Sequence, residues 1–203
     1  MTATLVLLRH ATTDWNESRL LQGRTDRPLS PAGHRQAQTW RLPPKAGVDP
    51  ESPWFSSPLR RCLDTAALMG QQPAIEPALI ETAWGDWEGQ RLADIRAADP
   101  EGVAKREEAG LDFHPPGGES ARDVQYRLQE FLDRRAAAGG IAVAVTHRGV
   151  IRALYALAVG WDMTGPPPDK LLPACAHSFA LRQGVLPTVV ALNLPLDKVA
   201  SAP

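Results

Sequence analysis

The chain has 203 residues and a formal net charge of −1, from 22 lysines and arginines against 23 aspartates and glutamates. This length favours a single domain over residues 1–203 and suffices to bury a core without disulfides. The balanced charge gives no electrostatic reason to expect a nucleic acid or a membrane as partner. Cys62 and Cys175 match neither a metal-binding spacing nor a disulfide framework. Without a signal-peptide pattern or a membrane-spanning apolar run, a cytoplasmic protein is expected.

The first part of the chain predicts short strands that alternate with helices. A buried strand is expected over residues 4–8, followed by a polar loop over residues 9–29 that is long enough to be functional. Ser30 followed by a proline is a typical helix start, so a helix is expected from there to Trp40. A second short strand is expected over residues 54–56.

The middle of the chain contains a predicted insertion. Ser57, again followed by a proline, repeats the helix-start signal, and a third short strand is expected over residues 74–76. Residues 91–118 then have the pattern of weak helices that end in a proline-glycine loop. Such a segment is expected to form a lid-like insertion in the domain.

The last part of the chain completes an alternating pattern. Ser120 predicts a capped helix that ends at Gly139, and a strand over residues 141–146 precedes a helix over about residues 150–158. Residues 179–192 have the pattern of a closing hairpin. Alternating strands and helices indicate an α/β fold. We expect a three-layer αβα arrangement with a mostly parallel central sheet and a small helical lid insertion.

Two of the predicted strands deliver a histidine at their carboxyl ends. The first strand leads into Arg9 and His10, and the strand over residues 141–146 leads into His147. In open α/β sheets, ligands bind in the crevice beyond the carboxyl ends of the strands. If the two strands are neighbours, the imidazoles meet there beside an arginine. That combination favours chemistry on an anion, with phosphate as the best candidate.

Candidate reactive groups lie in four segments: Arg9-His10, the block from Ser56 to Arg61, Glu81 before the Trp84–Gly89 block, and the run from Thr146 to Arg152. In this order, and together with Leu29-Ser30-x-x-Gly33, they resemble the histidine phosphatase superfamily, whose fold is phosphoglycerate-mutase-like. The resemblance covers most of the chain. The Trp-Gly-Asp-Trp-Glu-Gly block is also similar to that of small bacterial phosphatases of this group, such as the α-ribazole phosphatases.

The resemblance implies a phosphomonoester hydrolase that works through a phosphohistidine intermediate. It makes His10 the nucleophile, and it makes Arg9 and Arg61 the cations that hold the phosphoryl oxygens. A protonated His147 completes this clamp, and Glu81 protonates the leaving oxygen and later helps to activate water. Because the arginines take the part that metals take elsewhere, neither a metal nor a cofactor is expected.

A small phosphomonoester substrate is also expected to contact residues outside this set. The expected binding residues are Thr13, Asn16, Gln22, Gly23 and Arg148. Two positions depart from the family pattern, because Ala11 and Arg148 each replace the glycine that usually follows a site histidine. An alanine is tolerated there unless the backbone needs a positive φ angle.

Several alternatives stay open at the level of sequence. The same site residues serve cofactor-dependent phosphoglycerate mutases, and a non-catalytic phosphate-binding pseudophosphatase would also keep this fold. Arg60 is expected to face solvent, because its helix neighbour Arg61 matches the family motif. The sequence does not decide whether His114 or His177 reaches the pocket, what the physiological substrate is, or whether the protein is a monomer or a homodimer.

Overall fold

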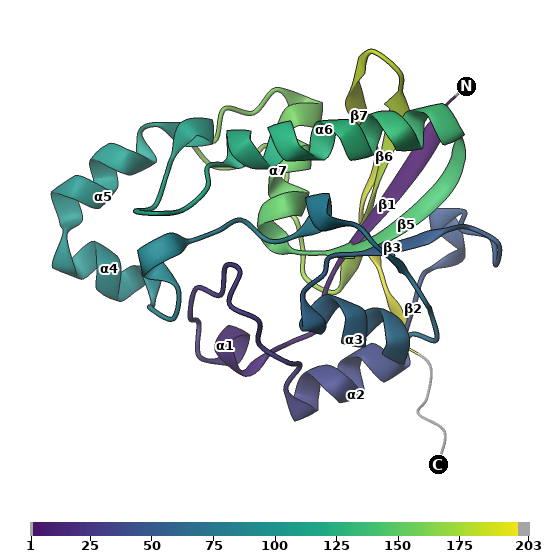
Figure 1. Cartoon of the computed structure of the whole chain (residues 1–203), viewed down its shortest axis with the longest axis horizontal. Coiled ribbons are helices and arrows are strands. Elements are labelled where there is room, and N and C mark those ends of the chain that lie inside the picture. Colours follow the sequence, from purple (N-terminus) through teal and green to yellow (C-terminus); the bar gives the residue numbers. More distant parts are fainter. Residues whose placement is uncertain (1, 199–203) are drawn as a thin grey trace.

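A six-stranded sheet in the order β4-β3-β5-β1-β6-β7 forms the centre of the computed structural model, which describes residues 2–198 (Figure 1). The strands are β1 (Ala3–Arg9), β3 (Trp54–Ser56), β4 (Ala74–Ile75), β5 (Gly140–Thr146), β6 (Cys175–Arg182) and β7 (Val185–Pro195). The pairings from β4 to β1 are parallel, and β6 and β7 are antiparallel to their neighbours. β2 (Trp40–Arg41) and β8 (Asp197–Lys198) form a separate small sheet.

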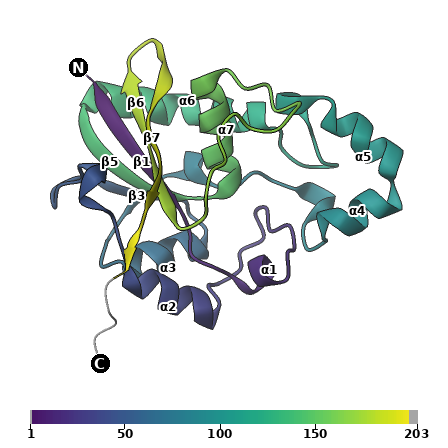
Figure 2. The same ribbon diagram turned by 180° about the vertical axis from the view of Figure 1, so that it is seen from behind.

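Helices cover both faces of the central sheet, as the two opposite views show (Figures 1 and 2). α2 (Pro31–Thr39) and α3 (Arg60–Leu68) lie on one face, whereas α6 (Ala121–Ala138) and α7 (Arg148–Val159) lie on the other. The predicted fold class, three αβα layers around a mostly parallel sheet, is therefore confirmed.

The sequence of β1 explains why the sheet needs cover on both faces. Val6 and Leu8 pack with the core on the α2 and α3 side, and Leu5 and Leu7 pack with the core on the α6 and α7 side. Successive side chains of a strand point to opposite faces, so an unbroken apolar run is stable only between two layers. β1 is thereby a fixed platform for the two polar residues at its carboxyl end.

The predicted insertion consists of short helices at one end of the molecule. α4 (Leu92–Ala98) and α5 (Pro100–Glu107) project beyond the sheet, and the 3₁₀ turn η4 (Gly110–Asp112) leads the chain back (Figure 1). A small apolar cluster of Trp87, Ile95 and Val103 holds this arm together. The cluster also contacts Leu21, so the arm packs on the loop that follows β1.

Helix starts follow the predicted signals in two cases and not in a third. The side chain of Ser30 caps α2, and Ser120 and Asp123 form the capping box of α6. The cap predicted at Ser57 is wrong, since α3 begins at Arg60 with no side-chain cap. The Ser57 hydroxyl lies at the site instead, 2.7 Å from a histidine nitrogen.

Short elements complete the connections that were predicted as loops. The loop after β1 contains α1 (Asp14–Glu17), and the 3₁₀ turns are η1 (Pro44–Ala46), η2 (Pro77–Leu79) and η3 (Gly85–Trp87). α1 went unpredicted because a four-residue helix shows no apolar periodicity. The closing hairpin is present and its strands are longer than the sequence pattern indicated.

Candidate active site

The register of β1 against β5 brings the two predicted histidines together. Arg9 lies opposite Thr146 in this parallel pair, so the next residue on each strand is a histidine at the same level. The rings of His10 and His147 are 5.2 Å apart, measured between centroids. The backbone N–H of His10 also donates to the carbonyl oxygen of Thr146 at 3.0 Å. The site therefore begins at the carboxyl edge of the sheet, as expected for an open α/β sheet.

His10 has the geometry of a neutral nucleophile. Its Nδ1 lies 2.7 Å from the carbonyl oxygen of Ala11, and a carbonyl can only accept, so Nδ1 carries the proton. Burial, and then the charges of Arg9 and Arg61, lower the pKa of His10 well below its ordinary value. The remaining nitrogen, Nε2, thus holds a free electron pair at neutral pH.

The alanine that departs from the family pattern carries no backbone strain. Ala11 does not have a positive φ angle, and its backbone N–H donates to the hydroxyl of Thr65 at 3.0 Å. A methyl group is therefore accommodated at this position, where it is buried in the core beside α3.

Arg61 is fully buried and held by three hydrogen bonds. It donates to the carbonyl oxygens of Gly23 and Thr25 at 2.8 and 2.9 Å, and its Nε–H donates to Nδ1 of His147 at 3.3 Å. A guanidinium has five N–H donors, so two remain for a ligand. Arg60 points away, with 68% of its side chain exposed and an ion pair to Asp64, as predicted.

His147 is neutral, which corrects the expectation of a protonated clamp. Because Nδ1 accepts from Arg61, the proton lies on Nε2, which donates to the Ser57 hydroxyl at 2.7 Å. Burial, and then the charge of Arg61, lower the pKa of His147 well below its ordinary value. Burial also raises the pKa of the adjacent Cys62 thiol, so this cysteine stays unreactive.

Glu81 is positioned by the first turn of α7. Its Oε1 accepts hydrogen bonds from the backbone N–H groups of Thr82 and Gly149 at 2.9 and 3.1 Å. A Cβ atom at Gly149 would lie 2.4 Å from Oε1 and 2.3 Å from the Thr82 hydroxyl. Only glycine leaves room for the carboxylate here. The sequence motif contained this glycine but gave no indication of that contact.

A cavity of about 660 Å³ connects most of these groups. Eight predicted site residues line it: Arg9, His10, Asn16, Gln22, Gly23, Arg61, Glu81 and Arg148. Two others lie behind its wall, because Thr13 is buried as the N-cap of α1 and His147 is buried beneath Arg61. The buried Nε of Arg9 and Oε1 of Gln22 have no hydrogen-bond partner within the described residues.

One carboxylate that the sequence analysis missed fixes a wall of this cavity. Glu88 accepts from the backbone N–H groups of Arg24 and Thr25, each at 2.9 Å, and from that of Trp84 at 3.1 Å. These bonds tie the Trp-rich block to the loop whose carbonyls hold Arg61. Glu88 is the glutamate of the Trp-Gly-Asp-Trp-Glu-Gly block. Its role could not be predicted because Arg24 and Thr25, to which it bonds, are distant in the sequence.

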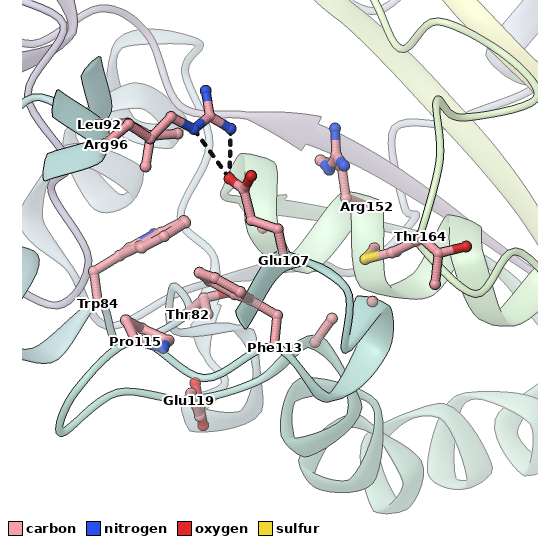
Figure 3. A pocket seen from close by; sticks show the side chains of 14 residues that line it. Thr82, Trp84, Leu92, Arg96, Glu107, Phe113, Pro115, Glu119, Arg152 and Thr164 are labelled. Carbon is pink, nitrogen blue, oxygen red and sulfur yellow. Dashed lines mark hydrogen bonds and ion pairs between the residues drawn. The ribbon is translucent and has the colours of Figure 1, made fainter. Parts of the chain in front are cut away.

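A second cavity, of about 370 Å³, lies under the α4–α5 arm and shares lining residues with the first. Its walls include the neighbouring rings of Trp84 and Phe113, which are 6.1 Å apart (Figure 3). Arg96 and Glu107 form an ion pair at its rim, at 2.5 Å. The combined space is large enough for a substrate with a substantial leaving group.

The two histidines that the sequence left open have different positions. His114 is half exposed and lies 2.7 Å from Asp123, so it lines none of these cavities. His177 is buried on β6 and lines a third cavity, of about 410 Å³, which also touches Arg9. Burial lowers the pKa of His177 to about 4.

Within residues 2–198, no group of three or more histidine, cysteine or acidic side chains is placed to hold a metal ion. In the same range, no helix is long and apolar enough to cross a bilayer.

Comparison with protein families identifies the family of the chain. A family model of the histidine phosphatase superfamily (branch 1) matches residues 5–194. The chain belongs to the histidine phosphatase superfamily. The predicted family is thereby confirmed, and the matched range includes the segments that supply the candidate site at the carboxyl ends of β1 and β5.

Named members of this superfamily are similar to the chain. A glucosyl-3-phosphoglycerate phosphatase of Mycolicibacterium vanbaalenii is 35% identical over 179 residues, which are 80% of this chain and 77% of that protein. The chain spans 44% of the length of the first curated relatives it matches, which are mycobacterial.

Solved structures of the superfamily share the fold over almost their whole length. The structure of a mycobacterial glucosyl-3-phosphoglycerate phosphatase in complex with VO3 has a TM-score of 0.73 and 30% identity, and the match covers 94% of this chain and 98% of that one. A putative alpha-ribazole-5'-P phosphatase from Escherichia coli has a TM-score of 0.75 and 25% identity, with 98% and 99% covered.

Proposed function

We propose that this histidine phosphatase hydrolyses small phosphomonoesters through a phosphohistidine on His10. The observation that carries the proposal is the free Nε2 of His10, which lies in one cavity with two arginines and one carboxylate. Phosphatase names among the similar proteins support the same reaction class. A cytoplasmic location and a small-molecule substrate are parts of this proposal.

The first chemical step forms the phosphohistidine. Nε2 of His10 attacks phosphorus as the bond from phosphorus to the ester oxygen breaks. The leaving oxygen takes a proton from Glu81, whose carboxyl group lines the same cavity. Arg9 and the two free N–H groups of Arg61 hold the phosphoryl oxygens, and their fixed charges stabilise the transition state.

The second step regenerates the protein. Water attacks the phosphohistidine, Glu81 takes a proton from that water, and the bond between phosphorus and Nε2 breaks to release inorganic phosphate. His147 acts through Arg61, which it holds in place as a neutral acceptor. Thr13 acts in the same indirect way, because it caps the short helix that carries Asn16 to the cavity.

The α4–α5 arm, within the insertion over about residues 91–118, serves as a lid over the leaving group in this proposal. Its cavity opens beside the phosphoryl site and is lined by aromatic rings and an ion pair. Closing such a space excludes water from the first step, when Glu81 must protonate the leaving oxygen.

Trapping of the intermediate tests this function. Rapid quenching with ³²P-labelled substrate is expected to leave an acid-labile, base-stable label on the wild type and none on His10→Ala. His34→Ala is the matched control, because His34 is exposed on α2, and it should keep both label and turnover. Turnover should survive EDTA and fall with vanadate. A label on serine or aspartate, or activity that depends on added metal, would refute the mechanism.

A further inference from the structure

The catalytic cavity contains more positive charge than a phosphoryl group requires. One glutamate, Glu81, lines it together with six arginines: Arg9, Arg19, Arg61, Arg96, Arg148 and Arg152. Arg9 and Arg61 have the phosphoryl group as their counter-ion in the proposed function. Arg96 is neutralised by Glu107, at 2.5 Å. Three arginines are left without a counter-ion among residues 2–198: Arg19, on the loop after β1, and Arg148 and Arg152, which lie together on α7.

Arg148 and Arg152 form no hydrogen bond and no ion pair with the other side chains of residues 2–198. The carboxylates around them are already engaged. Glu107 pairs with Arg96, and Glu119 pairs with Arg24 and Arg127. Glu81 accepts from two backbone N–H groups. Glu81 is therefore the one lining carboxylate without a cationic side-chain partner among residues 2–198, and its single charge, which also acts on Arg9, cannot balance both guanidinium groups.

Their position on α7 is electrostatically unfavourable without an anion. The two residues are one turn apart in the first turns of the helix, so their like charges repel and both oppose the helix dipole. Arg152 is also partly buried, with its guanidinium 5.0 Å from the centre of the Trp161 ring. Burial, and then the charge of Arg148, lower the pKa of Arg152. An anion bound between them would remove this repulsion.

The surrounding space reaches the phosphoryl site. Both arginines line the 660 Å³ catalytic cavity and the adjacent 410 Å³ cavity, and Arg9 lines these two cavities as well. Arg152 also borders the 370 Å³ cavity under the arm, which Arg96 lines as well (Figure 3). A group attached to the leaving side of the substrate can therefore lie against α7 while the phosphoryl group lies against Arg9.

We infer that Arg148 and Arg152 form a second anion-binding subsite, so that the preferred substrate carries another oxyanion beside the phosphoryl group that is removed. This inference rests on the proposed function. A carboxylate and a second phosphate share the required chemistry, since each presents paired oxygens to a guanidinium fork. Arg148, which stands where the family usually has glycine, is thereby a specificity-determining residue of this chain.

Matched substrates test the subsite. kcat/KM is measured for 3-phosphoglycerate, propane-1,3-diol bisphosphate and glycerol 3-phosphate, which has no anionic group besides its one phosphate. The ionic strength is near physiological because salt screens exposed charges. The wild type should prefer at least one of the first two over glycerol 3-phosphate by about tenfold or more, the scale of a charge-assisted hydrogen bond. Whichever is preferred identifies the oxyanion as carboxylate or phosphate.

Substitution shows whether α7 causes the preference. Arg148→Gln and Arg152→Gln should each reduce the preference ratio by about tenfold, whereas Arg182→Gln, which removes an exposed arginine on β6, should leave it unchanged. Arg152→Lys keeps the charge and is expected to retain part of the ratio. Melting temperatures identify any variant that fails to fold. If Arg152→Gln is such a variant, Arg148→Gln still tests the subsite, because Arg148 is exposed.

A binding measurement separates failure of the subsite from failure of the proposed function. In a His10→Ala background, calorimetry compares the affinities for 3-phosphoglycerate and glycerol 3-phosphate with and without Arg148→Gln. A difference that depends on Arg148 supports the subsite even if the wild type hydrolyses none of the three esters, which would refute only the function. Equal kcat/KM values in an active wild type, or a preference that survives both glutamine substitutions, would overturn the subsite.

Discussion

At the residue scale, the site depends on side chains whose protonation is set by burial. His10 and His147 are both kept neutral by desolvation and by nearby arginines, and each has one nitrogen committed to a fixed partner. Glu81 differs, because two backbone N–H groups hold its carboxylate at the start of α7. Residue type alone would not have shown that the two histidines have different hydrogen-bond partners.

The first prediction concerns Glu81 as the general acid. Glu81→Gln should slow hydrolysis of alkyl phosphates by about 10²–10⁴-fold, the range of general acid catalysis. It should affect p-nitrophenyl phosphate much less, because that leaving group needs little protonation. Steady-state kcat for both ester types measures the effect, with the exposed Glu130→Gln as control. Equal losses for both esters would show that Glu81 only positions water or phosphate.

At the element scale, strand register and helix starts carry the side chains to one place. β1 and β5 end at the same level, and β3 ends beside them, so that Ser57, His10 and His147 converge without any sequence proximity. The start of α7 then supplies the Gly149 N–H group that orients Glu81. A turn of helix is thus as much a part of the site as the side chains are.

The second prediction tests this role of the α7 start. Gly149→Ala places a Cβ within 2.4 Å of the Glu81 carboxylate, which must move. A displacement of this kind is expected to lower kcat for alkyl phosphates by about 10²-fold, with KM changed far less. Gly165→Ala is the control, because no atom lies within 4 Å of the added methyl group. Unchanged kcat in Gly149→Ala would show that the contact with Glu81 is dispensable.

At the scale of the whole molecule, the buried histidines lower the free energy of unfolding at low pH. His10, His147 and His177 are buried and have lowered pKa values, that of His177 to about 4. Below the ordinary histidine pKa of about 6.5, each of these side chains binds a proton when the chain unfolds. His114 acts in the opposite direction, because hydrogen bonding to the Asp112 carbonyl and to Asp123 raises its pKa, although its side chain is half exposed.

The third prediction follows from this proton uptake. The free energy of unfolding should be constant above about pH 7 and decrease as the pH falls from about 6.5 towards 5, by up to about 1.4 kcal/mol per pH unit for each buried histidine. Urea unfolding at several pH values measures the slope. His34→Ala should keep that slope, and His177→Asn should reduce it. A free energy that does not change between pH 7 and 5 would contradict the assigned neutral histidines.

Local sequence patterns were enough to predict the layers and most members of the candidate site. The apolar run of β1 required cover on both faces, the capping signals at Ser30 and Ser120 placed two helices, and the order of the motifs identified the family. These features are local, so they can be read from neighbouring residues.

The interactions of those members depend on contacts that form only in the folded chain. Ser57 does not cap α3, and its hydroxyl hydrogen-bonds to His147. Three features depend on contacts between residues that are far apart in the sequence. They are the neutral state of His147, the hydrogen bonds of Glu88 to the loop that holds Arg61, and the unpaired charges of Arg148 and Arg152. Burial and partner distances set these properties, and neither quantity exists until the strands have paired and the loops have closed over them.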